Sequence, residues 1–126
     1  MPKRILIVDD SATARSIIKR SLEICGFDDA EVLESGNGNE AMNVLKHEDV
    51  DIVFTDINMP YMNGEQLLKR IKSSPKLFDI PVVIITGMNN PAREKKLIAK
   101  HAAALLPKPL ALPDLRKVLE DNLHVI

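Results

Sequence analysis

Five short apolar runs, separated by longer segments with a helical repeat, set the strongest constraint on how this chain can fold. The runs lie at residues 4–8, 31–34, 52–55, 81–86 and 104–106. Two of them, Ile5-Leu6-Ile7-Val8 and Val82-Val83-Ile84-Ile85, are continuous rather than alternating. Such a run is typical of a strand buried on both faces, as in a parallel sheet. The runs therefore predict five parallel strands.

The segments between the runs have apolar residues at steps of three and four, the period of an amphipathic helix. These residues include Ala14, Ile17, Ile18, Leu22, Ala41, Val44, Leu45, Leu67, Leu68, Ile71, Leu112, Leu115, Leu119 and Leu123. Asn90 and Pro91 are typical of a helix start, and Gly26 suits the end of the first helix. A strand–helix unit repeated five times predicts an α/β fold with a doubly wound parallel sheet and right-handed crossovers.

The length and composition narrow the class of protein. A chain of 126 residues without repeats or a linker fits one domain. A formal net charge of −1 gives no support to nucleic acid or an anionic membrane as a partner. The single cysteine, Cys25, fits a reducing compartment, and its place on an apolar stripe predicts a core residue. No apolar stretch is long enough for a signal peptide or a membrane span, so we expect no membrane insertion and a cytoplasmic location.

Polar residues fall where the predicted strands end. Asp9 and Asp10 follow the first run, Asp56 follows the third, Thr86 ends the fourth, and Lys108 follows the fifth. In a doubly wound sheet the carboxyl ends of the strands share one edge, where function gathers. Crowded carboxylates favour a cation, and an oxygen-only ligand set suits Mg²⁺. A carboxylate can also act as a nucleophile that forms an acyl-phosphate, with positive charge stabilising the phosphoryl oxygens.

Each of these residues also has a plainer interpretation. An Asp-Asp pair after a strand is often a turn or a helix cap, and a lone aspartate such as Asp56 is usually a loop residue. Lys108 could be a solvated charge. The functional interpretation depends on all five residues meeting at one edge of one sheet.

With these residues in view, the chain resembles the receiver domain of bacterial two-component response regulators, and most closely the stand-alone, CheY-like type. The resemblance covers essentially the whole chain. It rests on the motifs Ile7-Val8-Asp9-Asp10-Ser11, Thr55-Asp56-Ile57-Asn58-Met59-Pro60, Asn63-Gly64, Ile85-Thr86-Gly87 and Lys108-Pro109. It implies a flavodoxin-like fold with strand order 2-1-3-4-5. It also implies that residues 1–126 form a single receiver domain without an output domain.

The resemblance implies a metal site and a phosphoacceptor. Asp56 is expected to be the phosphorylated residue. Asp10 is expected to bind Mg²⁺ directly, Asp9 mainly through water, and Asn58 through its backbone carbonyl. Asn58 and Asn89 also occupy positions that tune hydrolysis in relatives.

The resemblance further implies a switch rather than an enzyme. A histidine kinase or a histidine phosphotransfer protein would supply the phosphoryl group, and Thr86 and Lys108 would bind it. The Lys108–Pro109 bond is a candidate cis peptide. We expect a monomer that signals to another protein through the face formed by the fourth helix, fifth strand and fifth helix. Hydrolysis would reset it, with a phosphatase as a further partner.

Three positions depart from the family pattern. Leu105 stands where relatives usually have an aromatic residue that moves inward on activation, which leaves that coupling open. His101 stands where glycine is usual. A glycine there would suit a left-handed helix cap, a conformation that histidine tolerates less well. Pro107 lacks a backbone donor, which suits an edge strand. The charges of residues 93–96 are most simply a solvated helix face, although relatives engage partners there.

Two other functions compete with the switch. A metal-dependent phosphatase with an aspartate nucleophile typically has a second aspartate two residues later, where this chain has Asn58. A degenerate receiver that is never phosphorylated usually lacks the acidic pair, the acceptor or the lysine, all of which are present. The sequence leaves the output open among a flagellar motor protein, a phosphorelay enzyme and a kinase that uses the protein as a phosphate sink.

Overall fold

The computed structural model describes residues 2–87 and 90–123. Within these residues, strands and helices alternate along the chain. The elements are β1 (Arg4–Val8), α1 (Ala12–Leu22), the π-helical turn η1 (Glu23–Phe27), β2 (Glu31–Ser35), α2 (Gly38–His47), β3 (Ile52–Asp56), α3 (Gly64–Lys72), β4 (Val82–Thr86), α4 (Pro91–Ala99), β5 (Ala104–Pro107) and α5 (Leu112–Leu123). Each strand lies within one residue of its predicted range, and β3 extends to include Asp56.

The strands form one parallel sheet in the order β2-β1-β3-β4-β5. This order confirms the predicted flavodoxin-like fold. It places β1 and β3 side by side, with Val8 paired to Thr55, so the residues that follow β1 lie next to the end of β3. It also makes β5 an edge strand, which explains how Pro107 is tolerated within it.

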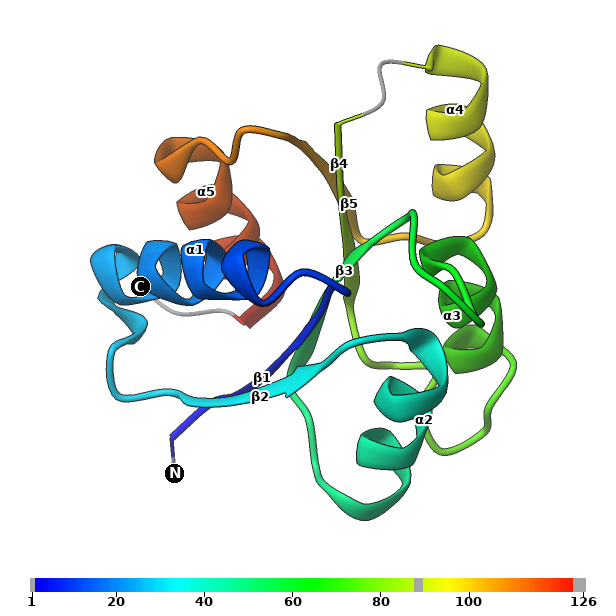
Figure 1. Cartoon of the computed structure of the whole chain (residues 1–126), viewed down its shortest axis with the longest axis horizontal. Coiled ribbons are helices and arrows are strands. Elements are labelled where there is room, and N and C mark those ends of the chain that lie inside the picture. The colour runs from blue at the N-terminus through cyan, green and yellow to red at the C-terminus, as the bar shows by residue number, and fades with distance from the viewer. Residues whose placement is uncertain (1, 88–89, 124–126) are drawn as a thin grey trace.

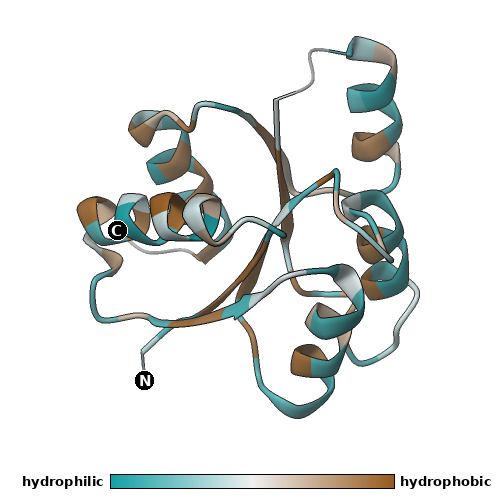
Figure 2. Ribbon diagram, in the orientation of Figure 1, coloured by the Kyte–Doolittle hydropathy of each residue, from teal (hydrophilic) through white to brown (hydrophobic). Residues whose placement is uncertain are grey.

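Helices cover both faces of the sheet, with α1 and α5 on one side and α2, α3 and α4 on the other (Figure 1). The two faces of each central strand therefore contribute to two separate cores. Ile5 and Phe54 pack with α1 and α5, whereas Leu6 and Val53 pack with the other three helices. In Figure 2 the central strands are correspondingly hydrophobic along their length. Burial on both faces is the physical reason for the continuous apolar runs in the sequence.

The helix boundaries follow from local capping. Asn90 is the N-cap of α4, with its side chain accepting from the backbone of Arg93, and Pro91 occupies the first turn. Gly26 has a φ of 95° and lies inside η1, which continues α1 and ends the helical segment. Both predictions about helix ends are confirmed. Cys25, in the same turn, is buried as predicted.

Helix α4 is held by less apolar surface than its neighbours. Leu97 is its one buried residue, whereas α2, α3 and α5 each bury four. After α4 the chain turns at His101, which has a φ of 71° and donates its backbone N–H to Ile98 O at 2.9 Å. The position is therefore left-handed, the conformation for which glycine is suited.

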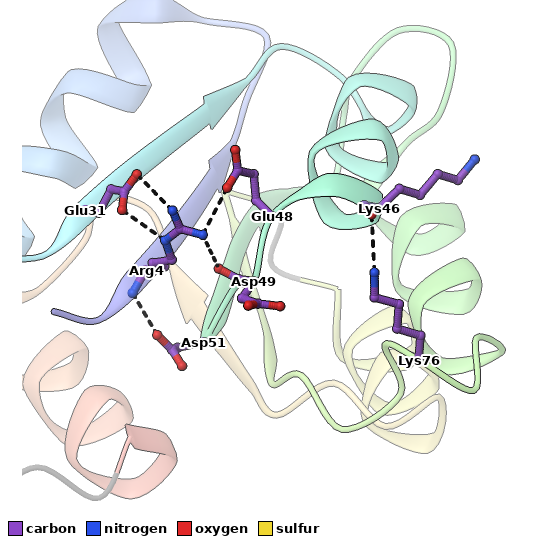
Figure 3. Close-up of polar contacts among 7 residues, drawn as sticks. All are labelled: Arg4, Glu31, Lys46, Glu48, Asp49, Asp51 and Lys76. Carbon is purple, nitrogen blue, oxygen red and sulfur yellow. Dashed lines mark hydrogen bonds and ion pairs between the residues drawn. The ribbon is translucent and has the colours of Figure 1, made fainter. Parts of the chain in front are cut away.

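A polar network closes the opposite, amino-terminal edge of the sheet (Figure 3). The Arg4 guanidinium donates to Glu31 at 2.9 Å and to Glu48 at 3.0 Å, and the Arg4 backbone N–H donates to Asp51 at 2.8 Å. These contacts join β1 to β2 and to the segment between α2 and β3. They fix the edge of the sheet that lies away from the predicted functional residues.

Candidate functional site

Three carboxylates meet at the carboxyl edge of the sheet. Asp9 and Asp10 follow β1, and Asp56 ends β3. One carboxylate oxygen from each residue lies within 4.8 Å of the other two. Asp9 is buried at 2% exposure, Asp56 is half-buried, and Asp10 is exposed. The sheet order thus brings together residues nearly fifty positions apart in the sequence, as predicted.

Among the described residues, the Asp9 carboxylate has a hydrogen-bond donor for only one of its two oxygens. Its Oδ1 accepts from the backbone N–H of Ser11 at 2.9 Å, but its buried Oδ2 has no hydrogen-bond donor among the described residues. Burial raises the pKa of Asp9, and repulsion from the Asp56 carboxylate raises it further. Bound cations are a common way to compensate such charge. Three clustered carboxylates with an unsatisfied buried oxygen fit a hard divalent cation, which prefers oxygen ligands.

Lys108 reaches into this acidic cluster from the end of β5. Its Nζ lies 3.4 Å from Asp56 Oδ1 and 3.6 Å from Asp9 Oδ2. Its backbone N–H donates to Thr86 O at 2.9 Å, which ties it to the end of β4. The Lys108–Pro109 bond is cis. One ammonium therefore faces both the proposed acceptor and the most buried carboxylate.

The backbone after Asp56 is fixed by a close approach of α3. Asp56 Oδ1 accepts from the N–H of Ile57 at 2.8 Å, and the N–H of Gly64 donates to Ile57 O at 2.9 Å. A Cβ atom at Gly64 would collide with the backbone carbonyl oxygen of Asp56. Only glycine permits this contact, which positions the start of α3 directly against the end of β3. The Asn63-Gly64 pair is a recognisable sequence motif, but a contact between Gly64 and the end of β3 is visible only in the fold.

Thr86 lies at the end of β4, buried at 5% exposure and beside Lys108. A cavity of about 300 Å³ opens between this strand end and α4, and its lining includes Thr86, Glu94 and Leu105. Leu105 is half-buried and packs against the core on the α2–α4 side of the sheet. The leucine thus occupies the position next to Thr86 with aliphatic surface, and it offers no hydroxyl.

The remaining predicted residues lie around this edge. Asn58 is exposed in the β3–α3 loop, two residues after Asp56, and Asn89 lies outside the described residues. The charges of residues 93–96 are not simply a solvated face, because Arg93 is half-buried and its Nη2 lies 3.7 Å from Glu65 Oε2. Sequence reasoning missed Glu65. It also missed Arg15, which donates to the backbone oxygen of Asp9 at 2.6 Å.

The chain is similar to known proteins in both sequence and structure. The family model described as "Response regulator receiver domain" matches residues 5–120. A "Chemotaxis protein CheY homolog" of Campylobacter jejuni is 39% identical over 121 residues, covering 95% of this chain and 92% of that protein. The structure of chemotaxis protein CheY4 of Vibrio cholerae, crystallised at low pH, superposes with a TM-score of 0.85 at 26% identity, covering 97% of this chain and 99% of that one. The Mn²⁺-bound form of response regulator Rcp1 superposes with a TM-score of 0.78 at 29% identity, covering 95% and 93%.

Among the described residues, no helix is both long and apolar enough to cross a bilayer.

Proposed function

This chain belongs to the response regulator receiver family of two-component signalling, and from that membership we propose that it is a phosphorelay switch with Asp56 as its phosphoacceptor. The observation that carries the proposal is the position of Asp56. Its carboxylate lies within 4.8 Å of two other carboxylates and 3.4 Å from the Lys108 ammonium. Phosphoryl transfer depends mainly on positioning and on charge stabilisation, which this arrangement offers.

Receiver domains bind a divalent metal, and we assign this role to Mg²⁺. Asp10 and Asp56 would ligate it directly, Asp9 mainly through water, and Asn58 through its backbone carbonyl. The oxygen-only donor set and the unsatisfied Asp9 Oδ2 support this assignment. When bound, Mg²⁺ supplies positive charge that offsets repulsion between the carboxylates and the incoming phosphoryl oxygens.

In the transfer step, a carboxylate oxygen of Asp56 forms a bond to phosphorus as the bond from phosphorus to the donor histidine nitrogen breaks. The Lys108 ammonium, already 3.4 Å from Asp56, would pair with a phosphoryl oxygen. The Thr86 hydroxyl would donate to another. Hydrolysis by water releases inorganic phosphate and restores the Asp56 carboxylate, which resets the switch. These reactions change the phosphorylation state of the protein itself and turn over no separate substrate. The chain would therefore act as a signalling protein and not as an enzyme.

The donor, a histidine kinase or a histidine phosphotransfer protein, would dock beside the acceptor on α1. An apolar groove of about 170 Å³ there is lined by residues that include Ile17, Ile18 and Lys108, the last of which also contacts Asp56. Ile17 is 57% exposed although it is strongly apolar. An exposed apolar groove next to the acceptor suits a transient protein contact.

The output is proposed to pass through the face formed by α4, β5 and α5. Contacts of Thr86 and Lys108 with the phosphoryl group would favour a minor conformation of this face, to the extent that those contacts differ between the two states. Residues 1–126 would act as a single, monomeric, cytoplasmic receiver domain that signals by binding another protein. The similarity to chemotaxis proteins favours a chemotaxis-type pathway, with a phosphatase as an additional partner.

Intact-mass measurement tests the acceptor. The protein is incubated with acetyl phosphate, with and without Mg²⁺. We expect the mass of one phosphoryl group to be added to the wild type only with Mg²⁺, and no addition to Asp56→Asn. An unmodified wild type, or an unchanged adduct on Asp56→Asn, would remove the basis of the proposal.

A second variant tests the role of Lys108. Lys108→Ala should still accept phosphate, because the nucleophile and the carboxylates remain, but it should lose the phosphate-dependent capture of a partner in a pull-down. Lys46→Ala, which removes a charge from an exposed position of α2 and away from both proposed docking surfaces, is the matched control. Partner capture that survives in Lys108→Ala would refute the assignment.

A further inference from the structure

Glu65 forms an ionic cluster that joins α3 to α4. Its Oε1 lies 2.7 Å from Lys100 Nζ and 3.4 Å from Lys96 Nζ, and its Oε2 lies 3.7 Å from Arg93 Nη2. The three cations are spaced three and four residues apart, so they form one stripe along α4. The Glu65 side chain is only 18% exposed, and hydrogen bonding to Lys100 lowers its pKa. A single carboxylate thus contacts most of the length of one helix.

The α3 side of this cluster is rigid. Glu65 directly follows Gly64, which packs against the backbone of Asp56. The first turn of α3 is closed by a capping box in which Asn63 and Gln66 each accept from the other's backbone. The helix also buries four residues. Glu65 is therefore fixed with respect to the acceptor.

The α4 side is held much more weakly. Leu97 is its one buried residue, so little apolar surface fixes the helix on the sheet. Its amino-terminal half faces Thr86, because Glu94 and Thr86 line the same cavity. In Figure 1, α4 extends beyond α3 at the carboxyl edge of the sheet. A change in the position of Thr86 could therefore alter the packing of α4.

From these contacts we infer that Glu65 is a positioning residue that holds α4 in its resting place, so that activation requires this ionic cluster to rearrange. We call the cluster of Glu65 with its three cations the latch. The inference rests on the proposed function, whose regulation it specifies. The latch opposes the same population shift that phosphorylation promotes. Weakening it should therefore raise both the mobility of α4 and the affinity of the site for a phosphoryl group, because coupling between two sites is reciprocal.

Two variants approach the latch from its two sides. Glu65→Gln removes the shared carboxylate. Lys100→Gln removes the cation that lies nearest to that carboxylate and leaves the sequence of α3 unchanged. Glu23→Gln is the matched control, because it breaks an exposed ion pair with Arg20 at 3.9 Å elsewhere on the molecule. An effect of Glu65→Gln that arose only from a disturbed start of α3 would not appear in Lys100→Gln.

The first measurement is amide hydrogen exchange of α4 in the unphosphorylated protein, followed by NMR. We expect exchange about two- to five-fold faster in Glu65→Gln, and a smaller increase in Lys100→Gln, as for the loss of partly exposed ion pairs. The second is a titration with beryllofluoride, a phosphoryl analogue, in the presence of Mg²⁺. Its apparent affinity should rise by about the same factor, since a larger fraction of molecules is competent to bind.

The outcomes separate the two proposals. If the wild type binds the analogue but both variants match Glu23→Gln in exchange and affinity, the latch is wrong and the phosphorelay function stands. Faster exchange without a gain in affinity would also overturn the latch, because α4 would then be uncoupled from the site. If the wild type neither binds the analogue nor accepts phosphate, the proposed function fails and the latch fails with it.

Discussion

The left-handed conformation of His101 offers a direct test of how backbone strain contributes to the stability of this protein. His101 has a φ of 71° and is exposed. For a residue with a side chain this conformation costs about 1–2 kcal/mol, because Cβ approaches the carbonyl oxygen of its own residue. Glycine lacks that atom. We therefore expect His101→Gly to raise the free energy of unfolding by about 1 kcal/mol, after the greater chain entropy of unfolded glycine is counted.

The expected shift in melting temperature follows from the size of the protein. An unfolding entropy of about 2.1 cal/mol/K per residue, taken over 126 residues, gives about 265 cal/mol/K. A gain of about 1 kcal/mol then corresponds to a rise of about 4 °C. Thermal and urea unfolding followed by circular dichroism would measure both quantities, and the urea m-value should stay unchanged.

The control is His101→Ala, which removes the same imidazole but keeps a Cβ atom. It should bring no gain, because the backbone strain persists. If His101→Ala stabilises the protein as much as His101→Gly, the effect comes from the side chain and the strain argument is refuted. A neutral or destabilising His101→Gly would refute it as well. Phosphate acceptance at Asp56 should be unaffected in both variants.

Three further predictions concern the site and its supports. Gly64→Ala should destabilise the protein by about 3 kcal/mol or more in urea unfolding, because its Cβ would meet the fixed backbone of Asp56; a loss below about 1 kcal/mol would show that α3 shifts freely. Asp9→Asn should stabilise the metal-free protein at pH 7 by about 1 kcal/mol and weaken thermal stabilisation by Mg²⁺. The raised pKa of Asp9 means that its charged form opposes folding above that pKa, a cost that disappears as the pH falls through it, so the gain over wild type should shrink in acid. Glu65→Gln should lose about 0.5–1 kcal/mol at pH 7. Since the pKa of Glu65 is lowered in the folded state, its contribution is present above the ordinary value of 4.5 and is lost as the pH falls through the lowered value, so a pH-independent difference between Glu65→Gln and wild type would contradict the cluster.

The sequence predicted the architecture because most of its signals are local. Continuous burial of β1 and β4 gave the parallel sheet, and the Asn90-Pro91 pair marked the start of α4. Convergence of Asp9, Asp10 and Asp56 followed from the rule that parallel strands end at one edge. The strand order itself came from family resemblance, since the apolar pattern does not show which strands are neighbours.

The features that the sequence did not reveal depend on contacts between distant segments. Glu65 reads as an ordinary charge in the first turn of a helix, and its pairing with Lys100 requires the packing of α3 beside α4. The reason for Gly64 is likewise a contact with the backbone of Asp56. The spacing of the cations at positions 93, 96 and 100 was a usable signal, because steps of three and four place them on one side of a helix. Such a stripe of cations predicts an acidic partner, although it does not identify Glu65.

The single thiol has a practical consequence for following this switch by spectroscopy. Cys25 is buried in the turn after α1, its Sγ lies 3.8 Å from Leu112 O, and burial raises its pKa. The thiolate is the species that reacts with alkylating reagents, so the native cysteine should label slowly near neutral pH. A cysteine introduced at the exposed Lys95 of α4 could then carry a fluorophore selectively, with Cys25 left in place. The packing of one core side chain thus leaves the wild-type background ready for a reporter on the helix whose movement is in question.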